Sequence, residues 1–322
     1  WKQHGAKTDS ERLDSIAVEQ MQGGTRRKHP YNAFLAKVIL NLEGLLPPDA
    51  SEDQILSLLS KFPRNNFAVV DDLQKAIGAA VYPIGCILNH SCRPNCILTY
   101  DGTRQIIRTV KSVTKGEELC HSYVDLITTR DERREQLMTT YGFACSCERC
   151  EEEKPNSESS GAKMDLRKVQ RLEDFPSEVQ DRLKIAYELH QKALGENDLS
   201  LERSLVQSIL EIRKEILDPY NLELHQTICW AMSLALLDND IQFARNMCRD
   251  IVQTLEAVLK PGMPMHPLLS TQLFTLAELE TANGNRNEAK RVISECIKYV
   301  RITHGEESQL YNKAMLFLLS LN

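Results

Sequence analysis

Three closely spaced cysteines, Cys145, Cys147 and Cys150, are the residues best suited to bind a metal ion. Their Cys-x-Cys-x-x-Cys spacing brings three soft thiolates close enough to share one ion. Tetrahedral zinc needs four ligands, so a fourth must come from elsewhere in the chain. We see no leader typical of export and expect a reducing compartment, where clustered cysteines more often bind metal than form disulfides. The motif therefore predicts zinc, with free or disulfide-bonded cysteines as the alternative.

A second cluster of polar residues runs from Asn89 to Asn95 and reads Asn-His-Ser-Cys-Arg-Pro-Asn. By itself it could be a turn with a satisfied histidine. A Gly-Glu-Glu turn and then Tyr123 follow it. Glu117 and Glu118 have the chemistry of a general acid–base pair, but neighbours in a turn or strand point apart, so we expect a structural role. A single tyrosine in a strand is most often a packed core residue, and Tyr123 needs further evidence.

The elements around these clusters change from helical to β along the first half of the chain. Apolar periodicity predicts that the first ninety residues are mostly helical. The expected helices are 10–22, 31–46 ended by Pro47-Pro48, a short one from Ser51 through Leu59, and one capped by Asp71 or Asp72 that ends near Ala80.

After Pro94 the pattern is typical of strands. Residues 96–100 and 105–110 flank Asp101-Gly102, which predicts a β-hairpin. A further strand is expected over residues 118–124, with His121 and Tyr123 on one face. A polar helix from Thr129 to Tyr141 then leads to the cysteines.

Residues 151–161 are charged and free of apolar side chains, which is typical of a solvated connection between domains. Nearly everything beyond is predicted helical, over residues 176–193, 199–217, 222–237, 241–258, 267–282, 286–303 and a last helix from Ser308. Four of these helices form two similar hairpins at a constant offset of 45 residues. Such a degenerate repeat of the tetratricopeptide type offers a concave surface to partner peptides. Plain helical packing without a ligand is the alternative.

Composition limits the possible functions. The 322 residues leave room for two domains, and 42% hydrophobic and 26% charged residues suit neither a disordered nor a membrane protein. The net charge of −6 and pI of about 5.8 argue against nucleic-acid binding and favour a basic partner. Cys229, Cys248 and Cys296 stand in helical, apolar surroundings and are expected to be buried free cysteines.

Together, these motifs resemble the SET domain of protein lysine methyltransferases, and more narrowly the SET and MYND domain family. The similarity runs from residue 65 to residue 150. It is carried by Asn65-Asn66-Phe67, Tyr82-Pro83, Asn89-His90-Ser91-Cys92 with Pro94-Asn95, Gly116-Glu117-Glu118, Ser122-Tyr123, Tyr141-Gly142-Phe143 and the cysteine triplet.

The resemblance implies an α+β fold: a SET-type β fold with a helical insertion and a post-SET zinc site, followed by an all-α tetratricopeptide-like C-terminal domain. The implied domains are the insertion region 1–64, the core SET part 65–128, the post-SET zinc segment 129–153 and the helical domain 154–322.

It also implies the roles of the site residues. S-adenosylmethionine is expected to contact Cys86, Leu88, Asn89, His90, Tyr141 and Phe143. The target lysine is expected to enter a channel lined by Phe67, Tyr123 and Phe143, with Tyr123 as the catalytic residue that orients the amine. Cys92 is the implied fourth ligand, so one structural Zn²⁺ is held by Cys92, Cys145, Cys147 and Cys150, and Cys96 is a spare core residue.

Two parts of the family pattern do not precede Ser10: a Gly-x-Gly strand pair that contacts the cofactor and a MYND zinc finger. Ile16 also stands where the family has an asparagine. We therefore expect these 322 residues alone to be catalytically incomplete, in a protein of the cytoplasm and nucleus that methylates lysines of histones or other proteins. Arg26-Arg27-Lys28 is expected to be a solvated loop. The rival hypothesis is a SET-like scaffold without catalysis whose helical repeats bind a partner peptide.

Overall fold

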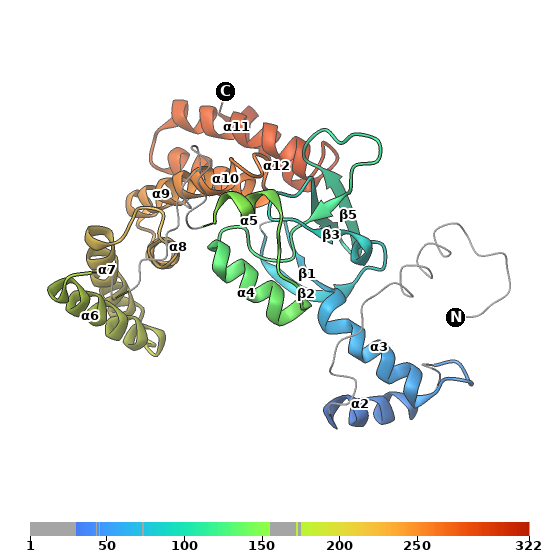
Figure 1. Ribbon diagram of the computed structural model, residues 1–322. Coiled ribbons are helices and arrows are strands. Elements are labelled where there is room, and N and C mark those ends of the chain that lie inside the picture. Colours follow the sequence, from blue (N-terminus) through green and yellow to red (C-terminus); the bar gives the residue numbers. More distant parts are fainter. Residues whose placement is uncertain are drawn as a thin grey trace.

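The computed structural model describes residues 30–42, 44, 46–72, 74–154, 172 and 175–321. A part built of small sheets and short helices precedes a stack of long helices (Figure 1). The first part contains α2 Pro30–Leu40, α3 Glu52–Asn65, β1 Asn66–Val70, β2 Ala76–Val81, the 3₁₀ turn η2 Gly85–Ile87, β3 Asn89–His90, β4 Cys96–Asp101, β5 Arg104–Thr109, β6 Cys120–His121, α4 Arg130–Tyr141 and α5 Glu148–Glu152. The second contains α6 Ser177–Leu194, α7 Leu199–Ile216, α8 Leu222–Leu237, α9 Ile241–Leu259, α10 Pro267–Ala282, α11 Arg286–Thr303 and α12 Gln309–Ser320. This architecture confirms the predicted fold class.

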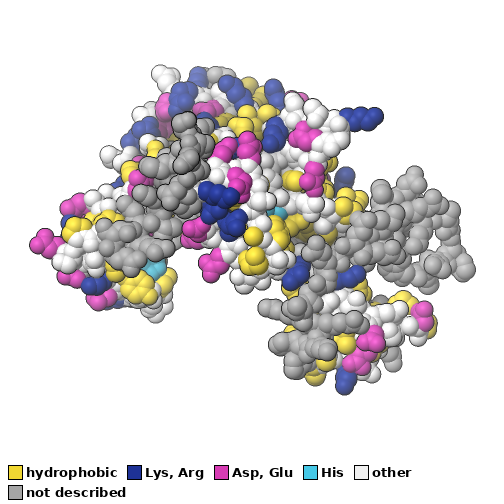
Figure 2. All heavy atoms as spheres, in the orientation of Figure 1, with side chains coloured by type: hydrophobic (Ala, Val, Ile, Leu, Met, Phe, Trp, Pro, Cys, Tyr) yellow, Lys and Arg dark blue, Asp and Glu magenta, His cyan; other side chains and the backbone are white. Residues whose placement is uncertain are grey.

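The helical hairpin of α2 and α3 projects from the rest of the molecule (Figure 1) and has a small core of its own around Ala36, Ile55 and Leu59. α2 ends at Leu40, earlier than predicted. α3 begins where predicted, because Ser51 and Gln54 form a reciprocal capping box, but it continues past residue 59 to Asn65. Hydrophobic side chains remain exposed on this hairpin, and yellow spheres are visible there in Figure 2. The helix predicted over 10–22 lies outside the described residues.

The prediction of a helix that ends near Ala80 is wrong. Residues 66–81 form an antiparallel β-hairpin in which Phe67 faces Ala80 in register. Asp71 does not cap a helix: its Oδ1 accepts the backbone N–H of Lys75 at 2.9 Å across the turn. Alanine-rich β2 has helical propensity, but pairing with the β-branched residues of β1 outweighs that weak preference.

The predicted hairpin of residues 96–110 is confirmed, with β4 and β5 antiparallel on either side of Gly102, whose φ is +56°. The strand predicted over 118–124 is only two residues long. This short β6 pairs in parallel with β3, so Asn89 faces Cys120 and His90 faces His121. The pairing brings the polar cluster beside the chain that leads to Tyr123.

The seven long helices agree with their predicted ranges to within one residue, apart from the last, whose N-cap is the predicted Ser308. The offset of 45 residues is also a structural equivalence. Asn239 and Gly284 both adopt positive φ, at 57° and 80°, in the turns before α9 and α11. Ala244 and Ala289 are both completely buried one turn later. The main hydrophobic core is continuous from the cysteine segment into these helices.

Candidate functional site

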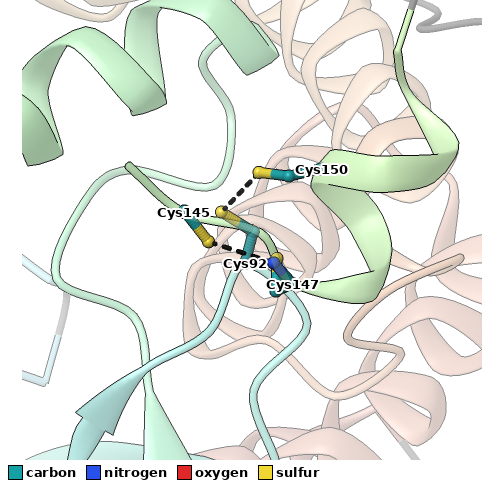
Figure 3. Close-up of side chains that lie close together, drawn as sticks. All are labelled: Cys92, Cys145, Cys147 and Cys150. Atoms are coloured by element: carbon teal, nitrogen blue, oxygen red, sulfur yellow. Dashed lines mark hydrogen bonds between the residues drawn. The ribbon is translucent and has the colours of Figure 1, made fainter. Parts of the chain in front are cut away.

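The four predicted zinc ligands meet at one point. The Sγ atoms of Cys92, Cys145, Cys147 and Cys150 all lie within 4.8 Å of one another (Figure 3). Cys92 follows β3, Cys145 and Cys147 lie in the loop after α4, and Cys150 is in α5. Three of the cysteines are buried and Cys147 is half-buried. Four thiolates at this separation suit a tetrahedral zinc ion and leave no open ligand position. The group could hold one metal ion.

The protonation of the thiols suits a cation. Hydrogen bonds from Cys150 and Cys92 hold the pKa of Cys147 well below its usual range. The hydrogen bond to Cys147 in turn raises the pKa of Cys150 to about 12. A metal ion bound by the group would displace the protons that the thiols carry.

Arginines surround the cysteines. Arg133 is fully buried, donates to the Thr128 carbonyl at 2.5 Å and pairs with Glu153. Arg130 Nε donates to the Cys150 carbonyl at 2.7 Å, and Arg134 donates to the Cys145 carbonyl. Four thiolates and one Zn²⁺ carry a net charge of about −2, so these cations favour the loaded site.

Next to the cysteines lies a cavity of about 1230 Å³. It is formed by the end of α3, β1, η2, β3, β4, the segment after β6 and the end of α4. The structure places seven of the predicted cofactor and channel residues in its wall: Phe67, Cys86, Asn89, His90, Tyr123, Tyr141 and Phe143. Leu88 does not line the cavity through its side chain, but its carbonyl accepts the Tyr123 hydroxyl proton at 2.6 Å.

Tyr123 is the centre of an aromatic cluster. Its ring centroid is 4.8 Å from that of Tyr141, 5.4 Å from that of His90 and 4.8 Å from that of His121. Burial, followed by the proximity of Tyr141, raises the pKa of Tyr123 to about 12. The phenol is therefore neutral at physiological pH. It can donate a hydrogen bond, and its lone pairs can accept one, but it is not a base.

His90 connects the cavity to the cysteines. The backbone N–H of Tyr123 donates to His90 Nδ1 at 3.0 Å, which leaves the ring proton on Nε2. Nε2 lies 3.2 Å from Cys92 Sγ. Burial lowers the pKa of His90 to about 4, so the ring is a neutral donor toward the sulfur. The His90 ring thus links the cysteine group to the backbone of Tyr123.

Asn95 aligns the two chain segments that cross here. Its side-chain amide donates to Glu117 Oε1 at 3.1 Å and to the Glu118 carbonyl at 2.8 Å. Its Oδ1 accepts the N–H of Cys120 at 2.8 Å. Asn89 Nδ2 donates to Glu118 Oε1 at 2.6 Å. Both glutamates are thus engaged in holding the turn and strands, as expected for a structural role.

Sequence reasoning missed several residues of the cavity wall. His121 packs against Phe67 with centroids 5.7 Å apart, and its shared face with Tyr123 was a visible signal. Arg64, at the end of α3, belongs to no sequence motif that would have marked it as a site residue. Met263 and His266, from the segment between α9 and α10, also line the cavity, and only the packing of the helical part against the sheets brings them there.

Two comparisons bear on this site. The sequence matches the SET domain family over residues 13–124. It is 26% identical to human Histone-lysine N-methyltransferase SMYD3 over 330 aligned residues, which cover 98% of this chain and 71% of that protein. Bovine N-lysine methyltransferase SMYD2 is 25% identical over 79% of this chain and 58% of its own length. Zebrafish N-lysine methyltransferase SMYD2-B is 27% identical, over 79% of this chain and 57% of its own length.

A membrane-spanning segment would need a long helix of apolar residues, and the part of the chain that the structure describes contains no such helix.

Proposed function

This chain belongs to the SMYD family of SET-domain protein lysine methyltransferases, and from that premise we propose that it transfers a methyl group from S-adenosylmethionine to a lysine side chain of a protein substrate. One observation carries the proposal: the 1230 Å³ cavity gathers Asn89, His90, Tyr123, Tyr141 and Phe143 from separate parts of the chain around one space. A cavity of this size is large enough for a cofactor and an inserted side chain.

The residues in the wall fit the proposed cofactor. Tyr141 and Phe143 supply aromatic faces suited to the adenine ring, and Asn89 is an exposed amide at the cavity wall. We propose that Cys86 and Leu88 contact the cofactor through the backbone. When bound, S-adenosylmethionine supplies an electrophilic methyl group on its sulfonium. The protein's task is then to align a neutral amine behind that methyl.

Tyr123 is the proposed catalytic residue. Its proton is held by the Leu88 carbonyl, so its oxygen lone pairs can accept an N–H of the incoming lysine amine. Phe67 and Phe143 provide apolar walls for the lysine stem. Lysine in water has a pKa of about 10.4, and an apolar channel disfavours its ammonium form. The channel thereby favours the neutral amine that can attack.

The proposed zinc ion, held by Cys92, Cys145, Cys147 and Cys150, is structural. It joins the loop that follows His90 of β3 to the segment that follows Tyr141 of α4 and contains Phe143. The two walls of the cavity then depend on one closed metal site. No catalytic step is assigned to the metal.

The proposed substrate is a basic, lysine-bearing protein of the cytoplasm or nucleus, because the net charge of this chain is −6. A histone tail is one such substrate. The helices α6 to α12 are proposed as a tetratricopeptide-like domain that receives a partner peptide.

The experiment is a calorimetric titration with S-adenosylhomocysteine, on these 322 residues and on the longest natural chain that contains them. A peptide array incubated with tritiated S-adenosylmethionine then reports transfer to lysine. We expect the longer chain to bind S-adenosylhomocysteine and to label lysine, and His90→Ala to reduce both. Binding by the longer chain alone would agree with the expectation that these 322 residues are catalytically incomplete. Absence of cofactor binding by both chains would contradict the proposal and favour the non-catalytic scaffold.

A further inference from the structure

We propose that Arg64 is a specificity-determining residue that pairs with a carboxylate of the ligand bound in the cavity. The inference rests on the proposed function and deepens it, because it names a chemical group that the substrate or the cofactor must present. Nothing in the sequence motifs singles out this arginine.

Arg64 lies in the last turn of α3, three residues before Phe67, and both residues line the cavity. Its side chain reaches across to the end of α4, where a Cβ placed on Gly142 would lie 3.6 Å from Nη2. Gly142 has a φ of +80° and caps α4 between Tyr141 and Phe143. The guanidinium therefore lies beside the two aromatic residues at the centre of the proposed site.

Arg64 has no ion pair and no hydrogen bond to any residue that the structure describes. By contrast, Arg93 pairs with Glu152, Arg133 and Arg149 pair with Glu153, and Arg213 pairs with Glu223. Arg64 is already half-buried. A ligand that covers it further must supply an anion or bear the cost of an unpaired buried charge.

The described part of the cavity wall holds few charged side chains. Among the described residues of this wall, Asp125 is the only Asp, Glu, Lys or Arg other than Arg64; it is exposed, and its Oδ1 accepts the N–H of Ile127 at 2.9 Å. Burial lowers the pKa values of the lining His121 and His266 to about 4, so these two rings are neutral. Among the described residues of the wall, Arg64 is therefore a fixed positive charge that a ligand meets.

Carboxylate is the chemistry that fits this charge, because a guanidinium offers paired donors at the spacing of two carboxylate oxygens. The carboxylate has two possible sources. One is an acidic residue that flanks the target lysine of the substrate, and the other is the methionine carboxylate of the cofactor. A substrate with a second basic residue at that position is disfavoured by repulsion.

The test compares Arg64→Gln with Arg64→Lys, and with Arg104→Gln as a control that removes an exposed charge of β5 outside the cavity wall. The substrate arm uses a peptide library with one central lysine and either Glu or Gln at each flanking position. The cofactor arm titrates S-adenosylhomocysteine, which has the carboxylate, and 5′-methylthioadenosine, which lacks it.

If the substrate supplies the carboxylate, the unsubstituted protein prefers Glu to Gln at one position by about tenfold in kcat/KM. Arg64→Gln abolishes this preference and Arg64→Lys restores part of it. If the cofactor supplies the carboxylate, Arg64→Gln weakens the binding of S-adenosylhomocysteine about tenfold and leaves the binding of 5′-methylthioadenosine unchanged. Equal behaviour of Arg64→Gln and Arg104→Gln in both arms overturns the inference. A protein that binds neither nucleoside and methylates no peptide instead contradicts the proposed function itself.

Discussion

Replacing Tyr123 with phenylalanine removes one oxygen at the centre of the site and leaves the ring in place. The lost hydroxyl donates to the Leu88 carbonyl at 2.6 Å, and a hydrogen bond of this kind contributes about 1 kcal/mol to stability. For a chain of this size, that corresponds to a fall in melting temperature of about 2 °C. The ring contacts with Tyr141 and His90 persist, so zinc content and S-adenosylhomocysteine affinity should change little.

The effect on methyl transfer should be far larger than the effect on stability. Loss of one positioned polar group at a reacting centre costs about 10²–10³ in kcat, or about 3–4 kcal/mol of activation free energy. The assay is single-turnover transfer of tritiated methyl to a lysine peptide, with protein saturated by cofactor. Tyr100→Phe is the matched control, since this tyrosine lines the same cavity and its hydroxyl only accepts a 3.4 Å bond from Gln105. Full activity in Tyr123→Phe would refute the assignment, and equal losses in both variants would reduce it to a general packing effect.

Three further changes test other parts of the structure. Cys147→Ser should lose the zinc ion, whereas Cys96→Ser, at a buried cysteine outside the group, should keep one zinc ion per chain. Metal analysis by mass spectrometry measures the zinc content of both variants. Zinc retained by Cys147→Ser would contradict the ligand set. Burial lowers the pKa of His266 to about 4, below its unfolded value of about 6.5. The folded state therefore binds fewer protons at this group, and His266 should contribute about 1.4 kcal/mol per pH unit to the fall in unfolding free energy from about pH 6.5 to about 4. His266→Asn should reduce the slope measured in urea titrations by about that amount, while the other buried histidines keep their share. Gly284 has a φ of +80°, so Gly284→Val should lower the free energy of unfolding by about 1–2 kcal/mol. Gly284→Asn should lower it much less, because Asn239 occupies the equivalent turn. Equal melting temperatures of the two variants would argue against the repeat.

The linear pattern of residues predicted much of this protein because most of its elements follow local rules. Five of the seven helices after residue 176 begin at a side-chain N-cap, and all seven lie where predicted. The hairpin around Gly102 depends on a turn signal of two residues. The cysteine spacing indicated a metal site, and resemblance to a family supplied Cys92 as its fourth member.

Local rules failed where pairing partners outweighed propensity. Residues 76–80 have helical propensity by composition and become a strand because β1 is available beside them. The strand before Tyr123 is shorter than its alternation suggested, because only Cys120 and His121 find a partner in β3. Such outcomes depend on which segments meet, and the order of residues does not state this.

The sequence by itself determined the chemical inventory of the site: the thiols, the Asn-His pair, the tyrosine and the aromatic residues, each at a position that a motif marked. Tertiary structure decided which of them share one space and what else stands there. It brought Arg64 from the end of α3 and His266 from the helical part to the same wall, although neither belongs to a motif. The reason is physical: ligand types and turn signals are written in neighbouring residues, whereas a cavity wall is made by side chains that meet only when distant surfaces pack.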